Sequence, residues 1–330
     1  MRFHPFHTLG SNKNIIVDGG AQESSVLVLS HWPASPTPEA WLRDTSAEIV
    51  LDYLKAHKIP PDVEYVSNNH FDEDGLFGIC ALLDPAFALA RRDRFVDAAT
   101  AGDFGRYRER DAARAIFTIS KLVSEVPEQP NHAEHAAQLY ETLIPMVPDL
   151  IDDIGRFEDK WRDEDRLLDD CEQWLDQGLV RIEEDEERDL AIVMIPPELP
   201  TQAYSHFASE AVGPLHEMAV YSRSNKARVL FQQGQRYWFR YRYETWVKFV
   251  SERHPFRVDL TPLCYELNGL EREGAKWTYD GSSNITPIMC LVDDKPSSLD
   301  LDTILDRLCR RLDEGEVDWN PFEVADSGHT

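Results

Sequence analysis

One stretch of the sequence, residues 62–83, constrains the fold more than any other. It begins with a β-favouring run at Val63–Val66 and continues through the polar turn Ser67–Asn69. It ends in an apolar run, residues 76–83, with helical spacing. This order is typical of a strand, a loop at its carboxyl end and a helix that starts from the loop. In open α/β sheets, ligands bind outside the carboxyl ends of strands, so we expect a site at this loop.

The loop carries three side chains that can bind a metal, His70, Asp72 and Asp74. Oxygen and imidazole donors suit a divalent cation such as Mg²⁺ or Mn²⁺. The alternative is that the aspartates only cap the following helix by accepting hydrogen bonds from its N–H groups. Two aspartates and Glu73 place more negative charge in one turn than capping needs, which favours a cation. Gly75 is expected to relieve the backbone where the chain turns into the helix.

Two earlier strands also end in potential ligands. Residues 14–20 form a predicted buried strand that contains Asp18 near its end, and residues 26–33 form a second, with His31 just beyond its end. A helix is predicted to begin at residues 44–48. Alternation of strands and helices predicts a parallel sheet, which would collect the strand ends at one edge. Alone, Asp18 fits a turn and His31 fits a structural histidine, but their convergence favours ligands.

The whole chain is predicted to be an α/β protein with three parts. Residues 1–130 form a metal-binding domain with a parallel sheet and a helical extension, and residues 131–178 form an acidic helical connector. Residues 179–330 form a smaller α+β domain that binds substrate. A hairpin at residues 179–195 and a final helix at residues 299–312 support the mixed class of this last part.

The predicted third part contains candidate anion-binding groups. In the strand at residues 236–245, alternation places arginines on one face and aromatic residues on the other. This basic island could hold an anion, or its arginines could pair with the acidic helices. The turn at residues 281–284 offers N–H groups and hydroxyls that could cradle an oxyanion. The predicted substrate-binding residues are Asn69, Arg240, Arg242, Ser282, Ser283 and Asn284.

Composition excludes several classes of protein. The net charge of −26 argues against a general nucleic-acid binder but leaves room for a small phosphorylated substrate in a local positive pocket. The sequence contains no run of about 18 apolar residues, so no membrane-spanning helix is expected. Residues 1–7 lack the apolar core of a signal peptide. The five cysteines are dispersed without CxxC spacing, which is typical of reduced thiols in the cytoplasm. The sequence does not predict an oligomeric state.

The run His70-Phe-Asp72-Glu-Asp74-Gly75 resembles the first motif of the DHH phosphoesterase superfamily, in which a His-x-Asp-x-Asp-Gly loop binds catalytic Mn²⁺ or Mg²⁺. The strand that ends in Asp18 resembles the second motif. The strand that ends at His31, with the helix after it, resembles the third. In the family the Asp-x-Asp loop comes first, and here it comes last, so the resemblance implies a circular permutation. It covers about residues 14–84 and implies a DHH-like domain.

The sequence departs from the family at specific positions. Ser30 and Trp32 stand where the third motif has an aspartate and a second histidine, and the fourth-motif aspartate has no clear counterpart, with Asp84 as the candidate. The resemblance implies that one or two cations bind to Asp18, His31, His70, Asp72 and Asp74. It further implies catalytic roles for His31, His70 and Asp74.

These observations predict a divalent-metal-dependent phosphoesterase that hydrolyses a small phosphorylated molecule or nucleotide by metal-activated water. Arg240 or Arg242 would neutralise charge that develops on the phosphoryl oxygens, and His31 could instead protonate the leaving group. The alternative is a non-catalytic DHH-like protein that binds a nucleotide or a partner, which the residues at positions 30 and 32 favour. A third possibility is metal-dependent chemistry on a substrate without phosphate.

Overall fold

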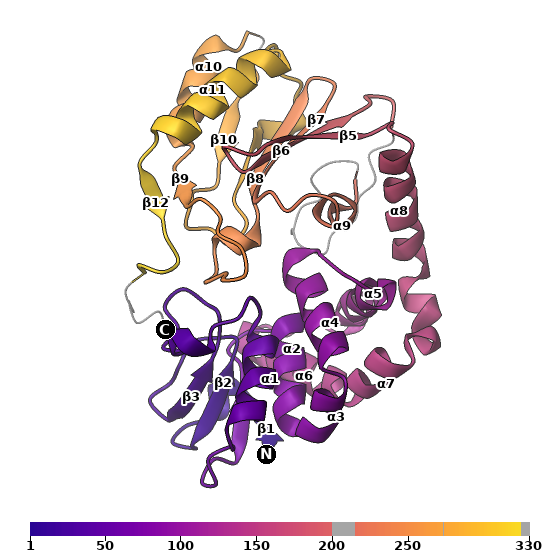
Figure 1. The fold of residues 1–330 in the computed structure, drawn as a ribbon, viewed down its shortest axis with the longest axis vertical. Coiled ribbons are helices and arrows are strands. Elements are labelled where there is room, and N and C mark those ends of the chain that lie inside the picture. Colours follow the sequence, from indigo (N-terminus) through magenta and orange to yellow (C-terminus); the bar gives the residue numbers. More distant parts are fainter. Residues whose placement is uncertain (200–214, 273, 325–330) are drawn as a thin grey trace. The chain divides into compact units, whose positions relative to one another are not determined.

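The computed structural model describes residues 1–199, 215–272 and 274–324, and the chain forms two compact units (Figure 1). Unit 1 comprises Met1–Arg166, Val247–Glu252 and Phe322–Thr330, and unit 2 comprises Leu167–Trp246 and Arg253–Pro321. The three functional parts expected from the sequence stay a prediction.

Unit 1 is built on a parallel sheet with the strand order β1-β4-β2-β3. Its strands are β1 (Arg2–Phe3), β2 (Asn14–Val17), β3 (Ser25–Leu29) and β4 (Tyr65–Ser67). Every residue of β2 is buried, as expected for a central strand covered on both faces. The predicted parallel sheet is therefore confirmed, and the carboxyl ends of β2, β3 and β4 lie along one edge.

The helices of unit 1 pack on this sheet and on one another. They are α1 (Ser46–Ala56), α2 (Glu73–Leu83), α3 (Pro85–Ala90), α4 (Arg92–Phe104), α5 (Arg110–Glu125), α6 (His132–Leu143) and α7 (Val147–Asp152). Short 3-10 turns occur at Phe6–Thr8, Glu39–Trp41, Ile144–Met146 and Ile154–Phe157. Helices α1 and α2 pack on each other and on β2, and α4 packs on α2. A side chain at Gly78 would begin 2.6 Å from Val17 Cγ1, so this glycine lets α2 lie close to β2.

Helix α8 (Glu158–Asp176) runs across the sequence boundary between the units and matches the predicted charged helix. Unit 2 then forms a mixed sheet with the order β10-β11-β8-β7-β6-β5. Its strands are β5 (Arg181–Asp185), β6 (Leu190–Ile195), β7 (Arg228–Gln233), β8 (Arg236–Tyr241), β10 (Trp277–Tyr279) and β11 (Ile288–Leu291). Strands β5 and β6 form the expected antiparallel hairpin, while β6 and β7 pair in parallel.

The core of unit 2 lies between one face of this sheet and two helices, α10 (Thr261–Leu270) and α11 (Leu301–Glu314) (Figure 1). Tyr237, Phe239 and Tyr241 of β8 lie in this core, which confirms the expected alternation up to residue 241. The strand ends there, and the expectation that it continues to residue 245 is wrong, because Tyr243–Thr245 forms a 3-10 turn. The remaining elements are α9 (Glu217–Tyr221), the paired strands β9 (Arg257–Val258) and β12 (Val317–Trp319), and 3-10 turns at Tyr243–Thr245 and Val292–Asp294. The predicted fold class, a parallel-sheet α/β part followed by an α+β part, is confirmed.

Two further expectations concern location. Within the described part of the chain, no helix is long and apolar enough to cross a bilayer. All five cysteines, Cys80, Cys171, Cys264, Cys290 and Cys309, are free, as expected for reduced thiols. A cytoplasmic location stays a prediction.

Candidate metal centre

The loops after β2 and β4 are packed against each other at the carboxyl edge of the sheet. Asp18 follows β2 directly and has a φ of 51°, in the left-handed region that residues other than glycine seldom adopt. Behind it, a side chain at Gly19 would begin 2.2 Å from Asn69 Oδ1, and that same oxygen accepts a hydrogen bond from Gly20 N at 3.2 Å. Asn69, predicted to bind substrate, therefore joins the two loops. Its role toward a substrate stays a prediction.

The first group of potential ligands is Asp18, His70 and Asp72. His70 Nε2 lies 2.8 Å from Asp72 Oδ2 and 3.5 Å from Asp18 Oδ2. One ligand atom from each residue falls within 4.8 Å of the others. Asp72 also caps α2, since its Oδ1 accepts a hydrogen bond from Gly75 N at 2.8 Å. Capping therefore uses one oxygen of Asp72, and the other faces the histidine.

Gly75 has a different role from the one expected. It lies inside α2 and its φ is not positive, so the prediction that it relieves the backbone at the turn is wrong. A Cβ at this position would lie 2.4 Å from Asn68 Nδ2, 2.5 Å from Tyr140 Oη and 2.8 Å from Asp72 Oδ1. Glycine is needed because these three side chains converge on its α-carbon.

The second group is Asp18, His31 and Asp74, all three with fully buried side chains. His31 Nε2 lies 3.3 Å from Asp18 Oδ1 and 3.9 Å from Asp74 Oδ2, and one ligand atom from each residue again falls within 4.8 Å of the others. Asp74 does not cap its own helix. Its oxygens accept hydrogen bonds from Ser46 N at 2.5 Å and Ala47 N at 2.7 Å, so the positive end of α1 stabilises this carboxylate.

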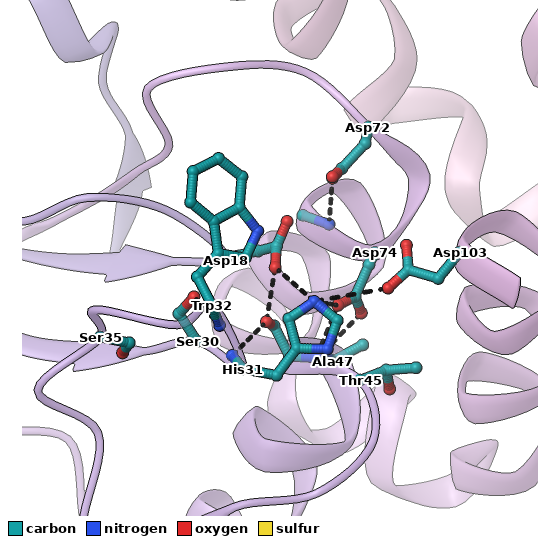
Figure 2. A network of polar contacts seen from close by, with 12 residues as sticks. Asp18, Ser30, His31, Trp32, Ser35, Thr45, Ala47, Asp72, Asp74 and Asp103 are labelled. Carbon is teal, nitrogen blue, oxygen red and sulfur yellow. Dashed lines mark hydrogen bonds and ion pairs between the residues drawn. The ribbon is translucent and has the colours of Figure 1, made fainter. Parts of the chain in front are cut away.

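Sequence reasoning missed Asp103, whose carboxylate also faces His31 (Figure 2). Asp103 lies on α4, its side chain is 5% exposed, and its Oδ2 lies 3.5 Å from His31 Nε2. Asp84, the candidate for this position, is exposed and caps α3 by accepting a hydrogen bond from Phe87 N, so that assignment is wrong. The sequence signal that could have indicated Asp103 is its position directly after residues 98–102, a run of small residues within a predicted helix.

The other ring nitrogen of His31 fixes which atom can bind a cation. Nδ1 contacts the backbone carbonyl oxygen of Asp44. A carbonyl oxygen can only accept a hydrogen bond, so Nδ1 carries a proton and Nε2 is the potential ligand atom. In many metal sites such a bond orients the ligating histidine. Figure 2 shows the His31 ring among Asp18, Asp74 and Asp103.

His31 and His70 supply positive charge that offsets the neighbouring carboxylates. Burial opposes charge on His31, but the hydrogen bond and charge of Asp18 and the charge of Asp74 raise its pKa to about 9. Burial likewise opposes charge on His70, and Asp72 and Asp18 raise its pKa to about 10. Burial also opposes ionisation of Asp18, yet hydrogen bonds and charge from the two histidines hold its pKa well below the usual range.

The two histidines do not fully compensate the other carboxylates. Burial, with the charge of Asp18, raises the pKa of Asp72 to about 6 and that of Asp74 to about 8. Burial and the charges of Asp74 and Asp72 raise the pKa of Asp103 well above its usual range. Like charges held this close disfavour ionisation unless a cation is present. The cluster therefore has the charge of a cation site.

The residues present fit divalent cations. Asp18 Oδ2 and Asp103 Oδ2 are buried, and each faces a histidine Nε2 at 3.5 Å, a long distance for a hydrogen bond, so these oxygens are poorly compensated without a further partner. Asp18 directs Oδ1 toward His31 and Oδ2 toward His70, so it can bridge two ions. Carboxylate and imidazole donors suit Mg²⁺ or Mn²⁺.

The predicted anion-binding arginines lie in unit 2. Arg240 is buried and ion-paired with Glu217 of α9, and Arg242 is buried and ion-paired with Glu244 at 2.5 Å. The arginines therefore pair with acidic residues, as the alternative for this strand expected, although the partners are not on α8. Their role in substrate binding stays a prediction.

The predicted anion loop is organised by a residue that the sequence did not indicate, Arg257. This fully buried guanidinium donates hydrogen bonds to the carbonyl oxygens of Ser282 at 2.8 Å, Asn284 at 2.5 Å and Ile285 at 2.8 Å. The hydroxyl of Ser282 donates to Asp318. The three carbonyls thus face a positive charge inside unit 2. Substrate binding by Ser282, Ser283 and Asn284 stays a prediction.

Comparison with known proteins gives a family but no activity. No curated protein matches the chain. A solved structure described as the pGpG-specific phosphodiesterase PggH from Vibrio cholerae is similar over 95% of this chain and 90% of its own, with 11% identity and a TM-score of 0.39. A TM-score this low establishes neither a shared fold nor a shared activity. The family of unknown function DUF6687 matches residues 1–321. The chain therefore belongs to the DUF6687 family.

Proposed function

We propose that this protein is a divalent-metal-dependent phosphoesterase of DHH type that hydrolyses a small phosphorylated molecule or nucleotide. The observation that carries the proposal is the position of Asp18 between two groups of ligands, His70 with Asp72 and His31 with Asp74. Asp18 would contribute to both groups if two cations bound, and two-metal sites of phosphatases stabilise the attacking and leaving oxygens.

Charge supports a pair of cations. The carboxylates of Asp18, Asp72, Asp74 and Asp103 carry four negative charges when ionised, and two divalent cations would balance them. Mn²⁺ or Mg²⁺ bound there supplies a water-derived nucleophile at neutral pH and polarises the phosphoryl group. The chain contributes the dry surroundings, since Asp18 and Asp74 are fully buried.

The two histidines differ in what they can reach. His31 is fully buried among three carboxylates, which suits a ligand better than an acid that protonates a leaving group. His70 has 29% of its side chain exposed and Asp72 has 25%, so these two ligands lie on the side of the site that solvent can reach. We propose His31 as a ligand held by Asp44 and His70 as the ligand at the open side of the site.

Unit 2 by itself contains a candidate anion-binding loop at residues 282–285. Because three loop carbonyls bond to Arg257, the loop at residues 282–285 is fixed in one conformation with a buried positive charge behind it. Burial lowers the pKa of Arg257 to about 10, which still leaves it charged at neutral pH. We propose that the backbone N–H groups of Ser283 and its neighbours bind a phosphate there.

A second candidate function is non-catalytic binding of a nucleotide or a partner. Ser30 and Trp32, which stand where the third motif has an aspartate and a second histidine, favour it. Ser30 is buried, with its N–H donated to Thr37 Oγ1 and its hydroxyl accepting from Trp32 N. It cannot act as a carboxylate. The Trp32 ring packs against the His70 ring at 4.7 Å, where it cannot transfer a proton as a histidine would.

Activity and binding can be separated with one set of proteins. Hydrolysis of bis(p-nitrophenyl) phosphate and of short nucleotides is measured with Mn²⁺ for the wild type, Asp18→Asn and the control Asp84→Asn, which changes an exposed carboxylate of the same unit. Chelator-sensitive turnover that is lost only in Asp18→Asn supports the enzyme. Manganese binding without turnover supports the binder, and absence of manganese binding contradicts the enzyme.

A further inference from the structure

A short segment, residues 247–252, is distant in sequence from the second group of ligands but lies beside it. Residues 247–252 belong to unit 1, although the chain on both sides of them belongs to unit 2. Lys248 N donates a hydrogen bond to the carbonyl oxygen of His31 at 2.8 Å, and Lys248 Nζ donates to Ser35 O at 2.9 Å. The segment is thus bonded directly to the backbone of a proposed metal ligand.

Asp44 connects the same segment to the ring of His31. Its Oδ1 accepts hydrogen bonds from Val250 N at 3.0 Å and Ser251 N at 2.9 Å, and its backbone carbonyl contacts His31 Nδ1. Any shift of the segment that moves Asp44 would therefore move the carbonyl that sets the orientation of the His31 ring.

The segment also contacts the helix that carries Asp103. The buried Phe249 ring packs edge-on against Phe104 at 5.1 Å, and Phe104 directly follows Asp103 on α4. The ring of Phe104 lies 6.3 Å from that of His31. Backbone hydrogen bonds from residues 247–252 therefore reach His31, and their ring packing reaches Phe104, the neighbour of Asp103 on α4.

The first group of ligands has its own support. His70 N donates to Asn68 Oδ1 at 3.3 Å, and Asp72 accepts from Gly75 N. Asn68 in turn donates to the hydroxyl of Tyr140 at 2.9 Å. These contacts come from the loop after β4, from α2 and from α6. These supporting contacts of His70 and Asp72 thus come from residues outside the segment 247–252.

We infer that residues 247–252, acting through Asp44, are a positioning segment for the His31 and Asp103 half of the metal centre. This inference rests on the proposed function, because it concerns the second of the two cation sites. At both ends the segment continues into unit 2, and its hydrogen bonds with the centre lie within unit 1.

Manganese titration of the full chain tests the inference, with isothermal calorimetry and electron paramagnetic resonance as readouts. We expect the wild type to bind two equivalents. In Asp44→Ala the affinity of one equivalent falls at least about tenfold while the other stays within about twofold. Asp44→Asn, which keeps an acceptor oxygen, restores most of the lost affinity. The control Asn131→Ala removes an exposed acceptor of another backbone N–H in the same unit and changes neither affinity.

Unchanged affinities in Asp44→Ala, or an equal loss at both equivalents, would overturn the inference while the proposed function stands. A wild type that binds no manganese overturns both. Hydrogen exchange on the metal-free protein gives a readout that does not need the cation, since Asp44→Ala should speed exchange at Val250 and Ser251. Should that variant not fold, Phe249→Leu removes the ring contact with Phe104 and should produce the same one-site loss.

Discussion

Replacing the shared aspartate should remove both cations, whereas replacing Asp103 should weaken one of them. Asp18 belongs to both groups of ligands, and Asp103 faces only His31. The pair Asp18→Asn and Asp103→Asn therefore tests whether the two groups share one carboxylate. Asp84→Asn serves as the matched control, since this exposed aspartate caps α3 outside the site.

The size of the effect follows from mass action. A ligand that binds only the folded state at 100 times its Kd stabilises that state by about 2.7 kcal/mol, so two ions contribute about 5.4 kcal/mol. About 1 kcal/mol shifts Tm by about 2–4 °C for a domain of the size of unit 1. Manganese should therefore raise the Tm of the wild type by roughly 10–20 °C, that of Asp103→Asn by about half as much, and that of Asp18→Asn very little.

The assay is differential scanning calorimetry with and without manganese, and each variant is compared with its own metal-free form. That comparison matters because the metal-free effects have opposite signs. Asp18→Asn removes the charge that both histidines pair with and should lower the metal-free Tm. Asp103→Asn removes a carboxylate that its neighbours repel and should raise it. Equal manganese shifts in both variants would refute a shared ligand.

Three further predictions concern protons and packing. The two site histidines have pKa values raised to about 9 and about 10, so a bound cation must displace their protons. Manganese affinity should therefore rise from pH 6 to pH 9 by about tenfold per pH unit for each displaced proton. Calorimetry in buffers of different ionisation enthalpy measures the number of protons released. In urea unfolding, Gly75→Ala should destabilise the fold by about 1–3 kcal/mol, because the added methyl group overlaps with its neighbours. The control Gly269→Ala lies in a helix with open space around the α-carbon and should stabilise the fold by about 0.5–1 kcal/mol. A Gly75→Ala variant that is more stable than the wild type would contradict the crowding at Gly75. Tyr140→Phe removes the hydroxyl that is hydrogen-bonded to Asn68. It should weaken manganese binding at the His70 site about tenfold and leave binding at the His31 site unchanged. A loss of affinity at the His31 site instead would show that this contact does not support the His70 half.

The strand ends could be predicted from the sequence because local patterns determine them. A parallel sheet places the residues after β2, β3 and β4 at one edge, so Asp18, His31 and His70 come together once the strands are recognised. The residue types then indicate a cation. The period of each strand and the order of the elements are enough to predict this edge of the sheet.

Contacts that depend on helix packing could not be predicted. Asp103 reaches His31 because α4 packs on α2 at a position that no local pattern specifies. Gly75 looked like a turn residue, yet it is required by side chains from the loop after β4 and from α6. Arg257 gives no signal in its own segment, because its partners are oxygens twelve or more residues away, among them the hydroxyl of Thr245 and the carbonyls of Ser282 and Asn284.

Diffraction from manganese-soaked crystals, recorded at the manganese absorption edge, tests the central claim most directly. We predict two anomalous peaks on either side of the Asp18 carboxylate, one beside His70 and Asp72 and the other beside His31, Asp74 and Asp103. A single peak that makes no contact with Asp18, or no peak at this edge of the sheet, would contradict the account.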